Sequence, residues 1–267
     1  MSKPGMATIA LRKYDVFTAI RMASEYGFAG VEIWGRPSHI PDPVDWEHVE
    51  AVSRAVKEHG LVVSMHGSYV NVGDDSWRSK AEESLRICEI LGTPIMRIWP
   101  GNKEPKDADN SFWMKMVSRL RDFCMMAADS GVILAMEMHA GTLAATIPGN
   151  ERLLAEVDCP NLKLNFQLTD YEPDYFDRAL PTLGEQVVNI HAQNYNKVMK
   201  DGKETRELTW IESGFADYAD LLKRLAAYGF DGFIEAEFFK GEFESEEVFL
   251  ESIRRDSAYL RRICGYS

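Results

Sequence analysis

The chain has 267 residues, of which 45% are hydrophobic and 27% charged, and its 30 basic and 42 acidic side chains give a net charge of −12. This composition excludes an intrinsically disordered chain, and no apolar run approaches the ~18 residues of a membrane-spanning helix. The excess of negative charge argues against nucleic acid and anionic membranes as partners, because both are bound by clustered lysine and arginine.

Short runs rich in aliphatic and β-branched residues recur along the chain, and most of them follow a glycine that ends an amphipathic stretch. Glycine in that place is typical of a helix end, and the run behind it of a buried parallel strand. In chain order, the sequence predicts strands at 8–11, 30–34, 61–66, 95–99, 132–137, 162–167, 187–193 and 232–237.

Amphipathic segments that separate these runs predict helices. One apolar stripe includes Val49, Val52 and Val56, and further stripes lie within 85–91 and 215–225. Strand and helix alternate about eight times without a linker, which predicts a parallel sheet with right-handed crossovers. We therefore predict a single (β/α)8 barrel over residues 1–267, close to the roughly 250 residues typical of that fold. A doubly wound open sheet is disfavoured because no GxGxxG motif follows the first strand.

Histidines end three of the predicted strands, whereas His39, His48 and His59 fall in loop or helix segments and are expected at the surface. In a barrel enzyme the chemistry lies where strands end. Residues two apart on a strand share a face, so the strand ends would gather a polar layer. Its members are His66, Glu137, His139, Asn165, Gln167, Asn189, His191, Gln193, Glu235 and Glu237. Buried polar groups need partners, so this layer predicts either a ligand site or a hydrogen-bonded polar plug.

Five segments resemble the xylose isomerase-like barrel superfamily, which groups sugar isomerases and epimerases, inosose dehydratases and endonuclease IV-type enzymes. The segments are 27–34, 61–66, 136–142, 189–191 and 229–237. Their order and spacing are similar to those of the small epimerase and isomerase members over nearly the whole chain. The resemblance implies a TIM-barrel enzyme of carbohydrate metabolism that binds one divalent metal ion.

The ligand set implied by the resemblance is Glu137, Gln167, His191 and Glu237, with Glu235 as a less favoured substitute on the same face. Gln167 departs from the family, in which aspartate is usual, and an uncharged amide binds a hard cation more weakly. Oxygen ligands with one imidazole suit manganese, magnesium or cobalt, and also zinc. We expect a more electrophilic, more weakly held ion or, alternatively, an empty site. An endonuclease IV-type zinc cluster is disfavoured, because only three histidines end strands.

The implied reaction is the isomerisation or epimerisation of a sugar or keto-sugar, in which Glu137 and Glu237 remove and return a proton next to a metal-bound carbonyl. His66, Arg97 and His139 are expected to bind substrate hydroxyls, although a structural salt bridge is an equal alternative for Arg97. The apolar face of the sugar would pack on tryptophans, for which plain packing is the alternative. These are Trp34 and Trp99.

Two alternative functions stay open. One is a dehydratase of the inosose dehydratase type, which begins with the same proton abstraction. The other is a partner-dependent subunit with a degenerate metal site. The first residues, Met1 to Gly5, lack the apolar stretch of a signal peptide. The four cysteines lie far apart, which predicts a cytoplasmic protein with reduced thiols. The resemblance also implies association into homo-oligomers.

Overall fold

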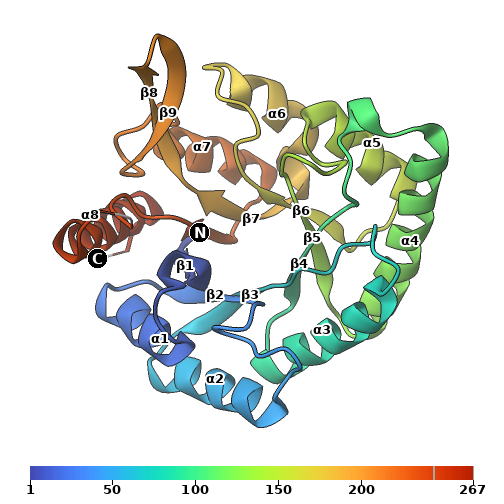
Figure 1. Ribbon diagram of the computed structural model, residues 1–267, viewed down its shortest axis with the longest axis horizontal. Coiled ribbons are helices and arrows are strands. Elements are labelled where there is room, and N and C mark those ends of the chain that lie inside the picture. Colours follow the sequence, from blue (N-terminus) through green and yellow to red (C-terminus); the bar gives the residue numbers. More distant parts are fainter. Residues whose placement is uncertain (243, 267) are drawn as a thin grey trace.

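The computed structural model describes residues 1–242 and 244–266, and within them eight parallel strands close into a barrel surrounded by helices (Figure 1). The strand order around the barrel is β1-β10-β7-β6-β5-β4-β3-β2, so β1 closes the ring between β10 and β2. The barrel strands are β1 (Lys3–Ala7), β2 (Gly30–Trp34), β3 (Val62–Gly67), β4 (Ile95–Ile98), β5 (Ile133–Glu137), β6 (Leu162–Phe166), β7 (Val187–Ala192) and β10 (Phe233–Ala236). The predicted (β/α)8 barrel is confirmed.

Helices cover the outside of the barrel and bury their apolar stripes against it. Asp15, Asp45 and Asp109 each cap a helix by accepting hydrogen bonds from backbone N–H groups of its first turn. The predicted stripe of Val49, Val52 and Val56 is buried. The helices are α1 (Val16–Glu25), α2 (Trp46–Glu58), α3 (Trp77–Leu91), α4 (Asn110–Asp129), α5 (Ile147–Val157), α6 (Tyr175–Leu183), α7 (Tyr218–Leu225) and α8 (Glu246–Cys264). In the described residues, no helix is both long and apolar enough to span a bilayer.

The first strand lies earlier than predicted. It runs over Lys3–Ala7, whereas Thr8–Leu11 forms a 3₁₀ helix. Pro4 and Gly5 have low strand propensity, but pairing with β2 and β10 on both sides overrides that preference. Gly5 is required where it stands, because an added Cβ would lie 2.8 Å from Cγ of Glu235 inside the barrel.

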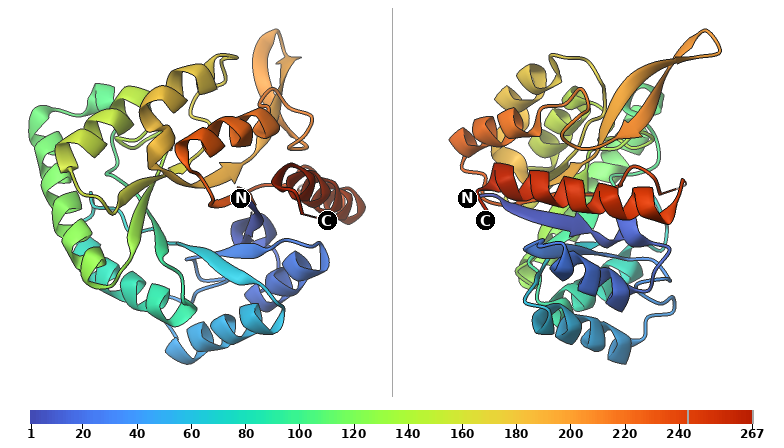
Figure 2. Two further views of the ribbon diagram at one scale, coloured as in Figure 1. Left: turned by 180° about the vertical axis from the view of Figure 1, so that it is seen from behind. Right: turned by 90° about the vertical axis from the view of Figure 1, so that its left-hand side faces the viewer.

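A hairpin that the sequence analysis did not predict follows β7 directly and projects beyond the barrel (Figure 2). It consists of β8 (Asn194–Lys200) and β9 (Lys203–Thr209), paired antiparallel. Asp201 and Gly202 form its turn with φ of 52° and 75°, and Asp-Gly is a strong signal for such a turn. Because β7 ends at Ala192, Gln193 lies between the barrel strand and this hairpin.

His39 is buried rather than at the surface as predicted. Its Nδ1 lies 2.8 Å from Oγ1 of Thr8, and its Nε2 lies 3.2 Å from the carbonyl oxygen of Tyr14. The loop after β2 therefore folds its histidine back onto the 3₁₀ segment. The four cysteines are free thiols, of which Cys159 alone is half-buried and the other three are buried.

Candidate active site

Four side chains predicted as metal ligands meet at the carboxyl end of the barrel, from the ends of β5, β6, β7 and β10. Nδ1 of His191 lies 3.4 Å from Oε1 of Glu237 and 3.8 Å from Oε1 of Glu137. Nε2 of Gln167 donates to Oε1 of Glu137 at 3.2 Å. All four are at most 5% exposed. Gln167 lies one residue beyond β6, not within it as predicted.

The buried atoms of this cluster that lack a hydrogen-bond partner fit a divalent cation. Nδ1 of His191 and Oε2 of Glu237 are buried and have no hydrogen-bond partner within the described residues. Unpaired buried polar atoms are costly, so they indicate a missing partner. Ligand atoms of Glu137, His191 and Glu237 lie within 4.8 Å of one another. Oxygen donors with one imidazole suit Mn²⁺, Mg²⁺, Co²⁺ or Zn²⁺.

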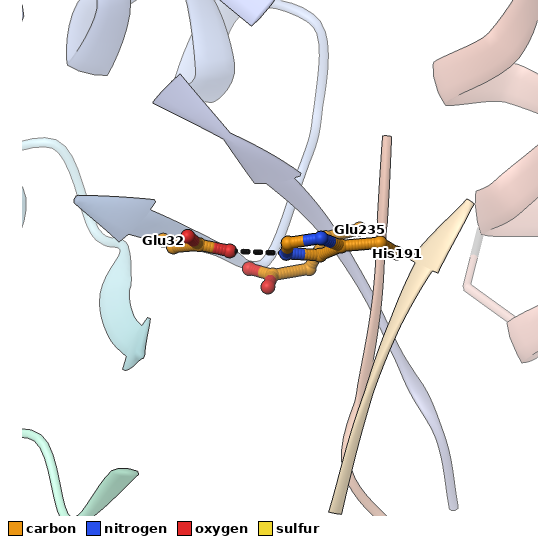
Figure 3. Close-up of side chains that lie close together, drawn as sticks. All are labelled: Glu32, His191 and Glu235. Carbon is orange, nitrogen blue, oxygen red and sulfur yellow. Dashed lines mark hydrogen bonds and ion pairs between the residues drawn. The ribbon is translucent and has the colours of Figure 1, made fainter. Parts of the chain in front are cut away.

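Glu32 on β2 is a site residue that the sequence analysis missed. Its Oε2 lies 2.5 Å from Nε2 of His191, across the barrel interior (Figure 3). A carboxylate in that position accepts the Nε2 proton and leaves the lone pair of Nδ1 facing Glu137 and Glu237. Gly67 makes room for it, because an added Cβ there would collide with the Glu32 carboxylate. The available signal was a glutamate in the middle of an otherwise apolar strand.

Arg97 on β4 joins two of these carboxylates. Its Nη1 lies 3.3 Å from Oε1 of Glu32, and its Nε lies 3.2 Å from Oε2 of Glu137. Burial alone would lower the pKa of the guanidinium, but Glu137 and Glu32 raise it above its ordinary value. The salt bridge that was one alternative for Arg97 is therefore present.

Glu235 lies beside Glu32 and His191, and ligand atoms of these three residues are within 4.8 Å of one another (Figure 3). Its Oε2 accepts a hydrogen bond from Nδ2 of Asn189 at 2.7 Å, and its Oε1 accepts one from Oγ of Ser64. Burial raises the pKa of Glu235 to about 8. Both of its oxygens are occupied, whereas Glu237 keeps one free. The geometry therefore favours Glu237 over Glu235 as the ligand from β10.

The charges of the cluster also fit a dication. The carboxylates of Glu32, Glu137 and Glu237 and the guanidinium of Arg97 together carry a net charge of −2. Burial would lower the pKa of His191, but Glu32 and Glu237 raise it well above its usual value. A cation at Nδ1 would therefore compete with a proton.

A cavity of about 610 Å³ opens above the cluster and is lined by Glu137, Gln167 and Glu237. Of the predicted substrate contacts, Arg97, Trp99 and His139 line it, and the ring centres of Trp99 and His139 are 4.9 Å apart. Its other lining side chains include Tyr69, Tyr171, Gln193, Tyr195, Arg206 and Phe238. Such a volume suits a small polar substrate.

Trp34 and His66 do not line this cavity. Nε1 of Trp34 donates to the hydroxyl of Tyr69 at 2.8 Å, so this tryptophan supports a cavity wall from behind. His66 is buried, and its Nδ1 has no partner among the described residues. Burial and the nearby Arg97 lower the pKa of His66 to about 4, so the ring is neutral.

The chain belongs to the xylose isomerase-like TIM barrel family, whose model matches residues 20–263. It is 30% identical over 172 residues to a 3-dehydroshikimate dehydratase of Bacillus anthracis, and this match covers 61% of the chain and 60% of that relative's length.

Solved structures show the same fold. A probable 3-DHS dehydratase of Bacillus anthracis, involved in petrobactin synthesis, aligns over 97% of this chain and 98% of its own with a TM-score of 0.78 and 22% identity. A xylose isomerase-like protein from Mycobacterium smegmatis in complex with magnesium has the same TM-score at 14% identity, covering 99% and 97%. A D-psicose 3-epimerase from Clostridium cellulolyticum with D-tagatose has a TM-score of 0.73 at 14% identity, covering 98% and 99%.

Proposed function

We propose that this chain is a divalent-metal-dependent enzyme that moves a proton at the carbon next to the carbonyl of a small polyhydroxylated ketone. The observation that carries this proposal is the convergence of Glu137 and Glu237 on Nδ1 of His191 at the floor of a polar cavity. The ion would be held by Glu137, Gln167, His191 and Glu237. When bound, it would polarise the substrate carbonyl and stabilise the negative charge that develops on its oxygen.

The two carboxylates come from strands separated by β6 and β7, so they reach the cavity floor from different sides. Arg97 and Gln167 hold Glu137 in place. One carboxylate removes the proton and the other returns it, on the opposite face for epimerisation or at the neighbouring carbon for isomerisation. Arg97 and His139 would contact substrate hydroxyls and Trp99 would cover an apolar face, and the position of all three in the cavity lining supports these roles.

Dehydration is a second candidate, favoured by the 30% identity to a 3-dehydroshikimate dehydratase. It begins with the same proton abstraction and then expels a hydroxyl from the next carbon instead of returning the proton. A degenerate, partner-dependent subunit is disfavoured, because ligand atoms of Glu137, His191 and Glu237 still lie within 4.8 Å of one another.

Metal analysis is the first test. The protein purified without added metal is compared with the Glu137→Gln/Glu237→Gln double variant, and Glu172→Gln, an exposed carboxylate change, is the control. We expect about one Mn, Zn, Co or Mg ion per chain in the wild type and the control, and none in the double variant. A wild type that holds no ion and whose melting temperature ignores added Mn²⁺ would contradict the proposal.

The net reaction is then assigned in D₂O with D-psicose, D-tagatose and 3-dehydroshikimate as probes. Deuterium entering a carbon skeleton that keeps all its oxygens supports epimerisation or isomerisation. Loss of water from 3-dehydroshikimate supports dehydration.

A further inference from the structure

The cavity is also lined by Arg206 on β9, a residue that was not among the predicted site residues. Its Cζ lies 3.6 Å from the centre of the Tyr171 ring. Tyr171 is itself held by Tyr195 and Phe215, whose ring centres lie 5.4 and 5.3 Å from its own. This cation–π contact fixes the guanidinium at the cavity wall and so reduces the entropy lost when it binds a ligand.

The charge of Arg206 is uncompensated by carboxylates. Within residues 1–242 and 244–266, no acidic side chain forms an ion pair with it, whereas Arg97, the other arginine of the cavity, contacts both Glu32 and Glu137. Across the hairpin, Lys197 is also paired, with Oε1 of Glu204 3.4 Å from its Nζ.

Arg206 and the two carboxylates of the cluster line the same cavity, so one ligand can reach both. The side chain of Arg206 is exposed, which leaves its guanidinium open to a ligand that enters from solvent. An anionic group on that ligand would meet a positive charge at the cavity wall, whereas a neutral sugar would not use it.

We propose that Arg206 binds an anionic substituent of the substrate, a carboxylate or a phosphate, while the hydroxyketone part of the same molecule lies over Glu137 and Glu237. This inference rests on the proposed function and narrows its substrate class to anionic polyhydroxylated ketones. The planar guanidinium can form two parallel hydrogen bonds with either anion. The hairpin, through Arg206, thereby selects substrates at the outer wall of the cavity.

The test is calorimetric titration of the Mn²⁺-loaded full chain with two pairs of probes that differ by one anionic group. 3,4-Dihydroxybenzoate against catechol tests a carboxylate, and D-fructose 6-phosphate against D-fructose tests a phosphate. In one of the pairs we expect the anionic member to bind about 10- to 100-fold more tightly, as for a charged hydrogen bond. Arg206→Gln should abolish that preference, and the matched control Lys197→Gln on the opposite strand should retain it.

The inference would be overturned if the two members bind equally in both pairs or if neither anion binds. It would also be overturned if the preference for the anionic member persists in Arg206→Gln. These outcomes are distinct from failure of the proposed function, because the titration requires no turnover. If the wild type binds no Mn²⁺, the same pairs are titrated against the metal-free chain. An anion preference that Arg206→Gln abolishes there would uphold the anion site while contradicting the metal-dependent reaction.

Discussion

The tautomer of His191 is set by Glu32, which accepts the proton on Nε2 and leaves the lone pair on Nδ1. Replacing Glu32 by Gln allows the amide to present N–H to Nε2, which favours the opposite tautomer and removes the lone pair from Nδ1. We expect Glu32→Gln to weaken Mn²⁺ binding about 10- to 100-fold, as changes behind a metal-binding histidine do. Competition against a chelator measures this, with circular dichroism to confirm the fold.

Glu235→Gln is the matched control for that change. Glu235 lies on β10 close to Glu32 and His191, and burial raises the pKa of its carboxyl to about 8, so an uncharged amide of the same shape is a conservative change. Its Mn²⁺ affinity should stay within about threefold of the wild type. Equal losses in the two variants would mean that Glu32 acts through general packing and not through His191.

A change at Gln167 should shift the metal affinity and the stability of the metal-free chain in opposite directions. Glu at this position would put a second carboxylate within hydrogen-bond distance of Glu137, where the amide now donates at 3.2 Å. We expect Gln167→Glu to lower the melting temperature of the metal-free protein through like-charge repulsion and to raise Mn²⁺ affinity about tenfold or more. Thermal melts with and without Mn²⁺ test both signs. The control is Gln193→Glu, because the amide of Gln193 donates to Gln167 and not to Glu137. This change should not increase the affinity for Mn²⁺.

At the scale of elements, α8 anchors the segment that returns from the hairpin through a buried carboxyl. Oδ1 of Asp256 accepts a hydrogen bond from the backbone N–H of Ile211 at 2.8 Å. Burial raises the pKa of Asp256 to about 7, from an ordinary value of 3.8. The folded state therefore favours the protonated form. Its stabilising contribution is complete below about pH 4 and is lost as the pH rises through about 7.

We expect Asp256→Asn to flatten the fall in unfolding free energy between pH 4.5 and 8, by an amount on the order of a few kcal/mol. Urea unfolding at several pH values measures this. Asp231→Asn, at an exposed position, should leave the pH dependence unchanged. If Asp256→Asn keeps the wild-type slope, the carboxyl does not titrate as the burial implies.

Local patterns were sufficient to predict most elements and a polar layer at the strand ends, because a residue at the end of a strand can be recognised from the sequence next to it. The four converging residues were singled out from that layer by the family resemblance. Glu32 was not predictable as a site residue, since its partner His191 is 159 positions away and meets it only once the barrel has closed. The first strand was misplaced for a related reason, because β1 is stabilised by its two neighbours and not by its own residues. The hairpin was missed although Asp201 and Gly202 signalled its turn.

At the scale of the whole molecule, closure of the barrel depends on β1. Deleting residues 1–7 would leave β2 and β10 with unpaired edges, which promote aggregation. We expect this variant to lose cooperative unfolding and to elute as aggregates from a sizing column. Shortening the hairpin at 198–205 to a two-residue Asn-Gly turn removes an element that projects from the barrel (Figure 2), and it should leave the melting temperature nearly unchanged. If the shortened hairpin destabilised the protein more than the deletion of residues 1–7, the hairpin would be part of the folding core.

The two glycines that make room for buried carboxylates bear on how the family diverges. Gly67 accommodates Glu32, and Gly5 accommodates Glu235. Each pair must be inherited as a unit, because a larger residue at the glycine position would displace the acid that it faces. Among homologous sequences, positions 32 and 67 should therefore covary, and so should 5 and 235. A homologue that has lost both members of the first pair would be expected to have lost the support of its metal-binding histidine with them.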